Sequence, residues 1–364
     1  MTKTEDSSLR RITATVLAIA IATSLTTACS SDKRELSEKA AAIVTGECQD
    51  ERNQTVTIYS GRTEYLIRPI IEAFACETGI DVRVRWGNST DLAILIGEEG
   101  TATEADVFLS RSPGPVGFLE SRGLLGTIDD EVLSLVDSQN RASSGSWIGF
   151  SGRKRVLVRN LDLVSDSELP ESVFDLTEDR YRGRVGLPAT NGSFEDWFTV
   201  FRDTYGDEVA TQWLRDMVAN DAEYYPNNRA IVEAAGRGEI DMGLVNHYYN
   251  FQKVAANGDA QRSANHGFAA GDDGGLMIIA TGTVMDSSKE KDTANRLLTH
   301  ILSDAQQTYL TNKVYEYPLA LGVMPADVLP PVPADRVGAV DIDDVAAEFT
   351  RTIEIIEASG ILDQ

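Results

Sequence analysis

Residues 55–86, TVTIYSGRTEYLIRPIIEAFACETGIDVRVRW, decide the fold class of this chain. Thr55–Tyr59 is rich in β-branched residues and Asp81–Trp86 alternates at a period of two, so both are predicted strands. Between them, Glu64–Thr78 carries apolar residues on one helical stripe and ends before a glycine. After one more predicted helix, Ala105–Leu109 forms a third strand. This β-α-β-α-β order predicts a parallel sheet with right-handed crossovers.

A second series of strands and helices follows the first. Strands are predicted at Arg155–Val158, Arg184–Leu187, Asp241–Asn246 and Leu276–Ala280, with helices between them. A chain of 364 residues is long enough for two domains. We therefore predict an α/β fold of two lobes joined by crossing hinge strands, with a ligand cleft between the lobes.

The first thirty residues predict export from the cytoplasm. Two arginines precede an apolar run, Ile12–Leu25, that is short for a membrane span, and small residues follow it. Cys29 comes next, as in a bacterial lipoprotein signal, so we expect residues 1–28 to be removed and Cys29 to carry a lipid. An ordinary secretory peptide cut nearby is the alternative. Residues 29–53 are then a polar tether and short N-terminal segment, which hold the protein at the outer face of a membrane.

Composition agrees with a secreted globular protein that does not bind nucleic acid. A formal charge of −24 disfavours contact with phosphates, which requires a basic surface. Cys48 lies just before the first predicted strand, and Cys76 lies near the end of the first predicted helix. Both points fall at the same end of a strand–helix unit, and an oxidising compartment favours pairing. We predict a Cys48–Cys76 disulfide in preference to two buried thiols.

Two adjacent tyrosines, Tyr248 and Tyr249, follow directly on the predicted strand Asp241–Asn246. A strand that leads into paired tyrosines places both hydroxyls near the carboxyl edge of the sheet, where open α/β folds bind ligands. Phenolate oxygen is a hard donor that suits a highly charged cation such as Fe³⁺. The alternative is an aromatic pair in which one ring packs and the other caps a loop. Taken alone, the pair is more typical of this second role.

Seven short stretches together resemble a known family. From about Thr55 to the C-terminus, they recur in the order and spacing of the ferric-ion-binding proteins that serve bacterial iron ABC transporters. The stretches are Tyr59-Ser-Gly-Arg62, Ala105-Asp-Val-Phe108, Ser151-Gly-Arg153, Asn191-Gly-Ser193, Tyr225-Pro-Asn-Asn228, Asn246-His-Tyr-Tyr249 and Glu316-Tyr-Pro318. The resemblance implies the type-2 periplasmic binding protein fold, a two-lobed clamp that closes on its ligand by a hinge. We place lobe 1 at residues 54–154 plus 276–328 and lobe 2 at residues 155–275 plus 329–364.

The resemblance also implies the metal ligands. Two consecutive tyrosines bind Fe³⁺ in that family, and the matching residues here are Tyr248 and Tyr249. Many members carry a histidine after the first strand, where this chain has Thr63, and the neighbouring Glu64 offers a hard carboxylate ligand. An equal alternative for Glu64 is a first-turn acid favoured by the helix dipole. Some members use a glutamate after the third strand, but this chain has Arg111 there, and a cation cannot ligate a metal.

Arg111 instead suggests an anion beside the metal. Members of the family often complete the iron shell with a small oxyanion, and such groups suit both the planar fork of arginine and a helix N-terminus. The alternative for Arg111 is a solvated loop residue. The expected anion is carbonate, phosphate or citrate. The residues expected on the anion side are Arg153, Asn191, Gly192, Ser193, Asn228, Asn246, Arg111 and Ser112.

The sequence therefore predicts a lipid-anchored monomer that captures Fe³⁺ for the permease of an ABC importer and is not an enzyme. One alternative is the same clamp binding another anion, or an iron chelate such as ferric citrate, by way of Arg111. The other is a surface-anchored enzyme with its active site in the cleft. It is disfavoured because the sequence shows no nucleophile–base constellation.

Overall fold

The computed structural model describes residues 36–49, 54–331 and 351–363. The predicted signal peptide and Cys29 lie outside the described residues, as do residues 50–53 and 332–350. Within those described ranges, no helix combines the length and the apolar character that crossing a membrane requires.

Strands from both halves of the chain join in one sheet, whose order is β2-β1-β3-β9-β4-β7-β5-β6. The first three strands pair in parallel, with Thr55 opposite Asp81 and Ile58 opposite Val107, as the sequence predicts. The strands are β1 (Thr55–Ser60), β2 (Asp81–Trp86), β3 (Val107–Ser110), β4 (Trp147–Asn160), β5 (Val185–Leu187), β6 (Glu223–Tyr224), β7 (Met242–Asn246), β8 (Ser263–His266), β9 (Met277–Val284) and β10 (Tyr317–Pro318).

The helices form where the sequence carries an apolar stripe between capping residues. In α2, the stripe that includes Leu66, Ile70 and Phe74 is buried, and Gly79 ends the helix in the left-handed conformation, with φ of 68°. The α-helices are α1 (Glu38–Ala41), α2 (Glu64–Thr78), α3 (Ser89–Glu99), α4 (Gly114–Glu120), α5 (Asp130–Leu133), α6 (Gly192–Tyr205), α7 (Asp207–Ala219), α8 (Asn228–Arg237), α9 (His247–Asn257), α10 (Lys291–Ile301) and α11 (Asp304–Tyr309).

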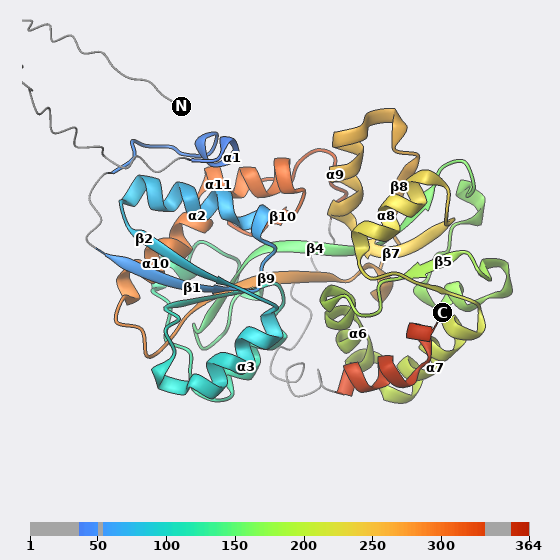
Figure 1. Ribbon diagram of the computed structural model, residues 1–364, viewed down its shortest axis with the longest axis horizontal. Coiled ribbons are helices and arrows are strands. Elements are labelled where there is room, and N and C mark those ends of the chain that lie inside the picture. Colours follow the sequence, from blue (N-terminus) through green and yellow to red (C-terminus); the bar gives the residue numbers. More distant parts are fainter. Residues whose placement is uncertain (1–35, 50–53, 332–350, 364) are drawn as a thin grey trace, which may run out of the picture. The chain divides into compact units, whose positions relative to one another are not determined.

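Two long antiparallel strands, β4 and β9, lie side by side and connect the two halves of the sheet (Figure 1). From Trp147 to Lys154, β4 pairs with β9, and from Arg155 onward it pairs with β7 and β8. The prediction that this strand starts at Arg155 was wrong, because the polar residues Ser151-Gly-Arg153 interrupt the apolar pattern. These residues are buried within β4, where Ser151 and Arg153 find polar partners.

Residues 36–49 are fastened to the outside of α2. A disulfide joins Cys48 to Cys76, and the backbone N–H of Gln49 donates to the carbonyl of Cys76 at 2.7 Å. Ala40 and Ile43 are buried in the same contact region. The described N-terminal segment therefore belongs to the half of the sheet that contains β1.

The helix α6 is buried almost throughout its length. Its aromatic residues Phe194, Trp197, Phe198 and Phe201 are fully buried in a core that β5 and α7 share. The indole N–H of Trp197 donates to the carbonyl of Asp273 at 2.7 Å. The first turns of α6 contact the loop after β3 through Asp196 and Ser112, which belong to the polar cluster described below.

Candidate functional site

The tyrosine pair lies just past the end of β7, in the first turn of α9. Because β7 ends at Asn246 and α9 begins at the next residue, Tyr248 and Tyr249 project from the carboxyl edge of the sheet. Their rings stack with centroids 4.2 Å apart. Tyr248 is buried against the core around β1 and α2, whereas Tyr249 is half-buried. In the described part of the chain, neither phenol oxygen takes part in a hydrogen bond, so both are free to act as donors to a metal.

A buried ion pair lies close to the tyrosines. Both carboxylate oxygens of Glu316 accept from Nη2 of Arg62 at 2.7 Å, and the hydroxyl of Ser151 donates to the same carboxylate at 2.5 Å. The side chains of Arg62 and Glu316 are 2% and 0% exposed. Burial alone would raise the pKa of Glu316, but Arg62 and Arg153 hold it below its ordinary value. Glu316 is therefore a fixed negative charge at neutral pH.

The electrostatic environment keeps the phenol of Tyr248 protonated. Burial raises the pKa of Tyr248 well above its ordinary value, Tyr249 and Glu316 raise it further, and Arg153 lowers it. Burial and the neighbouring Arg62 lower the pKa of Arg153, while Glu316 and Tyr248 oppose this change. Arginine stays charged even so. A cation that binds the phenol oxygen of Tyr248 must therefore displace its proton.

The residues expected on the anion side include four that form one hydrogen-bonded network around Arg155. The side-chain oxygen of Asn191, which caps α6, accepts from Ser193 and from the amide of Asn228 at 2.9 Å. The side-chain oxygen of Asn228 accepts from Arg155 at 3.0 Å and from the backbone N–H of Asn246 at 3.2 Å. The structure thus brings together the N-termini of α6 and α8 and the end of β7.

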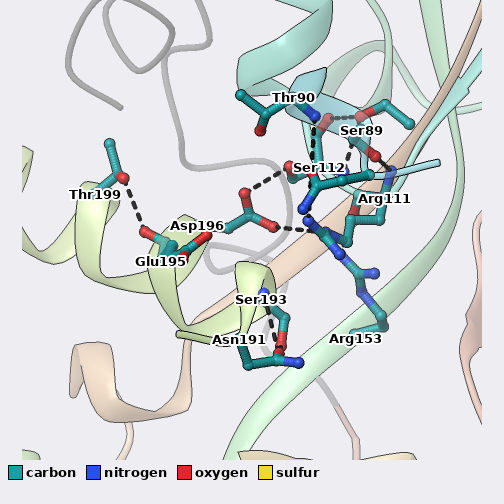
Figure 2. Close-up of polar contacts among 12 residues, drawn as sticks. Ser89, Thr90, Arg111, Ser112, Arg153, Asn191, Ser193, Glu195, Asp196 and Thr199 are labelled. Atoms are coloured by element: carbon teal, nitrogen blue, oxygen red, sulfur yellow. Dashed lines mark hydrogen bonds and ion pairs between the residues drawn. The ribbon is translucent and has the colours of Figure 1, made fainter. Parts of the chain in front are cut away.

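Arg111 and Ser112 meet a carboxylate that the sequence did not single out (Figure 2). Asp196 of α6 accepts from the hydroxyl of Ser112 at 2.8 Å and pairs with Nε of Arg111 at 3.7 Å. Arg153 donates to the backbone oxygen of Arg111. Gly192, the first residue of α6, lies so close that an added Cβ would stand 2.0 Å from Nη2 of Arg111. A side chain at this position would have to displace the guanidinium of Arg111, so glycine allows Arg111 to lie against the helix N-terminus.

Glu64 lies at the surface, where it forms a different ion pair. It is the first residue of α2, and its carboxylate accepts from Nε of Arg68 at 2.7 Å, with both side chains about half exposed. This contact fits the alternative role of a first-turn acid, so a ligand role for Glu64 stays a prediction. The next residue, Tyr65, accepts from Arg229 of α8 at 3.1 Å and lies 3.3 Å from Gln252 of α9.

Sequence reasoning gave no role to Arg62, Glu316, Arg155 or Asp196. The first two stand in stretches that carried the family resemblance. For Asp196 there was a signal, because it is an acid inside an aromatic stretch of the sequence, and such an acid needs a partner when the stretch is buried.

Comparison with known proteins defines the class. The chain belongs to the family of bacterial extracellular solute-binding proteins, which it matches over residues 103–346. It is 29% identical to the Fe(3+)-binding periplasmic protein of Serratia marcescens, over 85% of this chain and 91% of that protein. It is 27% identical to the major ferric iron-binding protein of Neisseria gonorrhoeae, over 84% of this chain and 93% of that protein.

A solved structure shows the same architecture. Iron-bound HitA from Pseudomonas aeruginosa aligns with a TM-score of 0.77 and 30% identity, over 84% of this chain and 99% of that chain. The predicted two-lobed periplasmic binding protein fold is thereby confirmed.

Proposed function

We propose that this protein binds Fe³⁺ through Tyr248 and Tyr249 and delivers it to the permease of an ABC importer. The stacked phenol pair at the end of β7 carries the proposal, because phenolate oxygen is a hard donor for a hard cation. The names of the iron-binding relatives support the same cargo. Among the described residues, no three His, Cys, Asp or Glu side chains gather as a metal site. The proposed role is binding and transport rather than catalysis.

The charges near the tyrosines support an additional anion. The side chains around the tyrosines form a cluster of four arginines and two carboxylates, which has a net positive charge. Two phenolates would balance this charge. Bound Fe³⁺ then adds three positive charges in a partly dehydrated site, which is costly unless an anion accompanies the metal. The cluster comprises Arg62, Arg111, Arg153, Arg155, Asp196 and Glu316.

We propose carbonate, phosphate or citrate as this synergistic anion. Arg153 supports the proposal by its position, because it interacts with both Tyr248 and Asp196. The proposed anion-binding residues are Arg153, Asn191, Gly192, Ser193, Asn228 and Asn246. Arg153→Ala should reduce iron affinity and its dependence on the anion together, because the anion loses its fork-shaped partner.

A second candidate is the same clamp taking an anionic iron chelate such as ferric citrate. The raised pKa of Tyr248 favours this candidate, since a protonated Tyr248 leaves the cluster with a net positive charge. Such a cluster attracts an anion before any metal arrives.

We propose the lobe boundaries and anchoring that the sequence predicts. The change of partner strand along β4, between Lys154 and Arg155, supports a boundary at residues 154 and 155. Lobe 1 is then residues 54–154 plus 276–328, and lobe 2 is residues 155–275 plus 329–364. The protein acts as a monomer that a lipid on Cys29 holds at the outer face of the membrane.

Titration of the purified protein with a ferric salt tests the proposed function. We expect a visible phenolate-to-iron absorption band that saturates at one iron per chain when carbonate or phosphate is present. A ferrous salt under anaerobic conditions is the matched control and should give no such band. A band that develops only with citrate favours the chelate. The absence of a band in every buffer contradicts iron binding by the phenols.

A further inference from the structure

Asp196 is a buried carboxylate of α6 that lies between Glu195 and the aromatic residue Trp197. It is 5% exposed, and its neighbours Phe194 and Trp197 are fully buried. Burial raises the pKa of Asp196 above its ordinary value, and Arg111 and Arg153 offset only part of this rise. A carboxylate in such surroundings is costly unless groups of opposite charge and hydrogen-bond donors face it.

Those partners come from the loop that follows β3. Ser112 donates to Asp196 at 2.8 Å, and Nε of Arg111 lies 3.7 Å from the second carboxylate oxygen. Arg111 is itself held in place, because its backbone N–H donates to the hydroxyl of Ser89 at 3.0 Å and its Nη2 donates to Asn88 at 3.1 Å. Figure 2 shows Arg111 and Ser112 on one side and the carboxylate of Asp196 on the other.

The approach of Arg111 to α6 also requires a negative charge. The N-terminus of a helix carries a partial positive charge, and Arg111 lies directly against Gly192, the first residue of α6. Two positive groups at this distance repel each other unless an anion lies beside them. Asp196, one turn further along the same helix, supplies that anion from within the chain.

We propose that Asp196 is a resident anion. Its carboxylate takes the position on Arg111 and Ser112 that a free oxyanion would otherwise fill, and it joins the loop after β3 to α6. The anion that accompanies iron is then held by Arg153 and the Asn191 network, without Arg111. The inference rests on the proposed function, because it assigns the anion-binding residues of that same site.

Chemical rescue with formate tests the proposal. Asp196→Ala removes the carboxylate and leaves room for a small one, so formate should bind to Arg111 and Ser112 in its place. We expect Asp196→Ala to bind iron about tenfold or more weakly than the wild type, which is the effect of losing a charged hydrogen bond. Added formate should restore the affinity. Formate should also raise the thermal midpoint of the iron-free variant, relative to chloride at equal ionic strength.

Matched variants separate the charge of Asp196 from its shape. Asp196→Asn fills the same space without the charge and should gain nothing from formate. Asp196→Ala/Arg111→Met should lose the rescue, because formate then has no guanidinium partner. An equal response to formate in wild type, Asp196→Ala and Asp196→Asn overturns the proposal, and so does a rescue that survives the loss of Arg111.

A second comparison covers the case in which Asp196→Ala does not fold. Arg111→Met leaves a buried carboxylate without its cation, whereas the double variant removes both partners. Because a lone buried charge is more costly than none, the double variant should melt above Arg111→Met. A double variant that melts below Arg111→Met overturns the proposal. These midpoints need no iron, so failure of the wild type to form a phenolate band would contradict only the proposed cargo.

Discussion

Glu316→Gln breaks the buried ion pair beside the tyrosines while it keeps the size of the side chain. Arg62 would then hold its charge in a buried position without a carboxylate partner, close to the like charge of Arg153. The substitution weakens two contacts from Arg62 at 2.7 Å and one from Ser151 at 2.5 Å. Because removal of one partner from a buried pair costs about 3–5 kcal/mol, we expect the free energy of unfolding to fall by this amount.

The loss should depend on pH in a defined direction. The folded-state pKa of Glu316 lies below its ordinary value, so its contribution to stability is present above the unfolded-state pKa. That contribution disappears as the pH falls through the folded-state pKa. The difference between wild type and Glu316→Gln should therefore be full at neutral pH and should shrink under acidic conditions.

Urea unfolding of the iron-free protein across this pH range measures the effect. Glu239→Gln is the matched control, because Glu239 pairs with Arg237 at the surface, where the side chains are 55% and 57% exposed. An exposed pair contributes little, so this variant should unfold like the wild type. Destabilisation by Glu316→Gln that is no greater than that of the control would contradict this prediction.

Iron uptake should release protons, because burial keeps the phenol of Tyr248 protonated before binding. The amount of base that keeps the pH constant during uptake should correspond to about two protons per iron. Iron uptake without proton release would contradict this prediction. Replacing both Cys48 and Cys76 with serine should cost about 2–4 kcal/mol of unfolding free energy in urea. Mass spectrometry of the non-reduced wild type should show the two peptides linked, whereas free thiols at both positions would remove the bridge. Glu64→Gln should weaken iron binding more than Thr63→Ala does, because the amide lacks the charge that Fe³⁺ requires; equal affinities would leave Glu64 a helix-end acid.

The fold follows from the sequence wherever burial has a regular period. Glu64–Thr78 has the boundaries that its apolar stripe and terminal glycine predict. The first half of β4 does not follow from such a pattern, because Ser151 and Arg153 are polar residues that lie inside the sheet. These side chains are buried beside hydrogen-bond partners that are far away in the sequence. A periodic pattern of neighbouring residues cannot reveal such partners.

The same distinction separates the parts of the candidate site. Tyr248, Tyr249 and Asn191 could be singled out because the family resemblance falls on them and they stand at the ends of predicted elements. Asp196 could not be placed in the same way, because its hydrogen-bond partner Ser112 lies 84 residues away. Arg62 and Glu316 are 254 residues apart, so only the folded chain shows that they pair.

The most direct test of the central claim is a ferric titration of three tyrosine variants, followed by the phenolate-to-iron band. Tyr248→Phe and Tyr249→Phe remove only a hydroxyl, so the ring packing and the circular dichroism spectrum should survive. Tyr224→Phe is the control, because its hydroxyl lies on β6 and bonds with Thr190 at 2.7 Å. We predict that the first two variants lose the coloured complex and that the control keeps it. Full colour and full iron affinity in Tyr248→Phe or Tyr249→Phe would contradict the account.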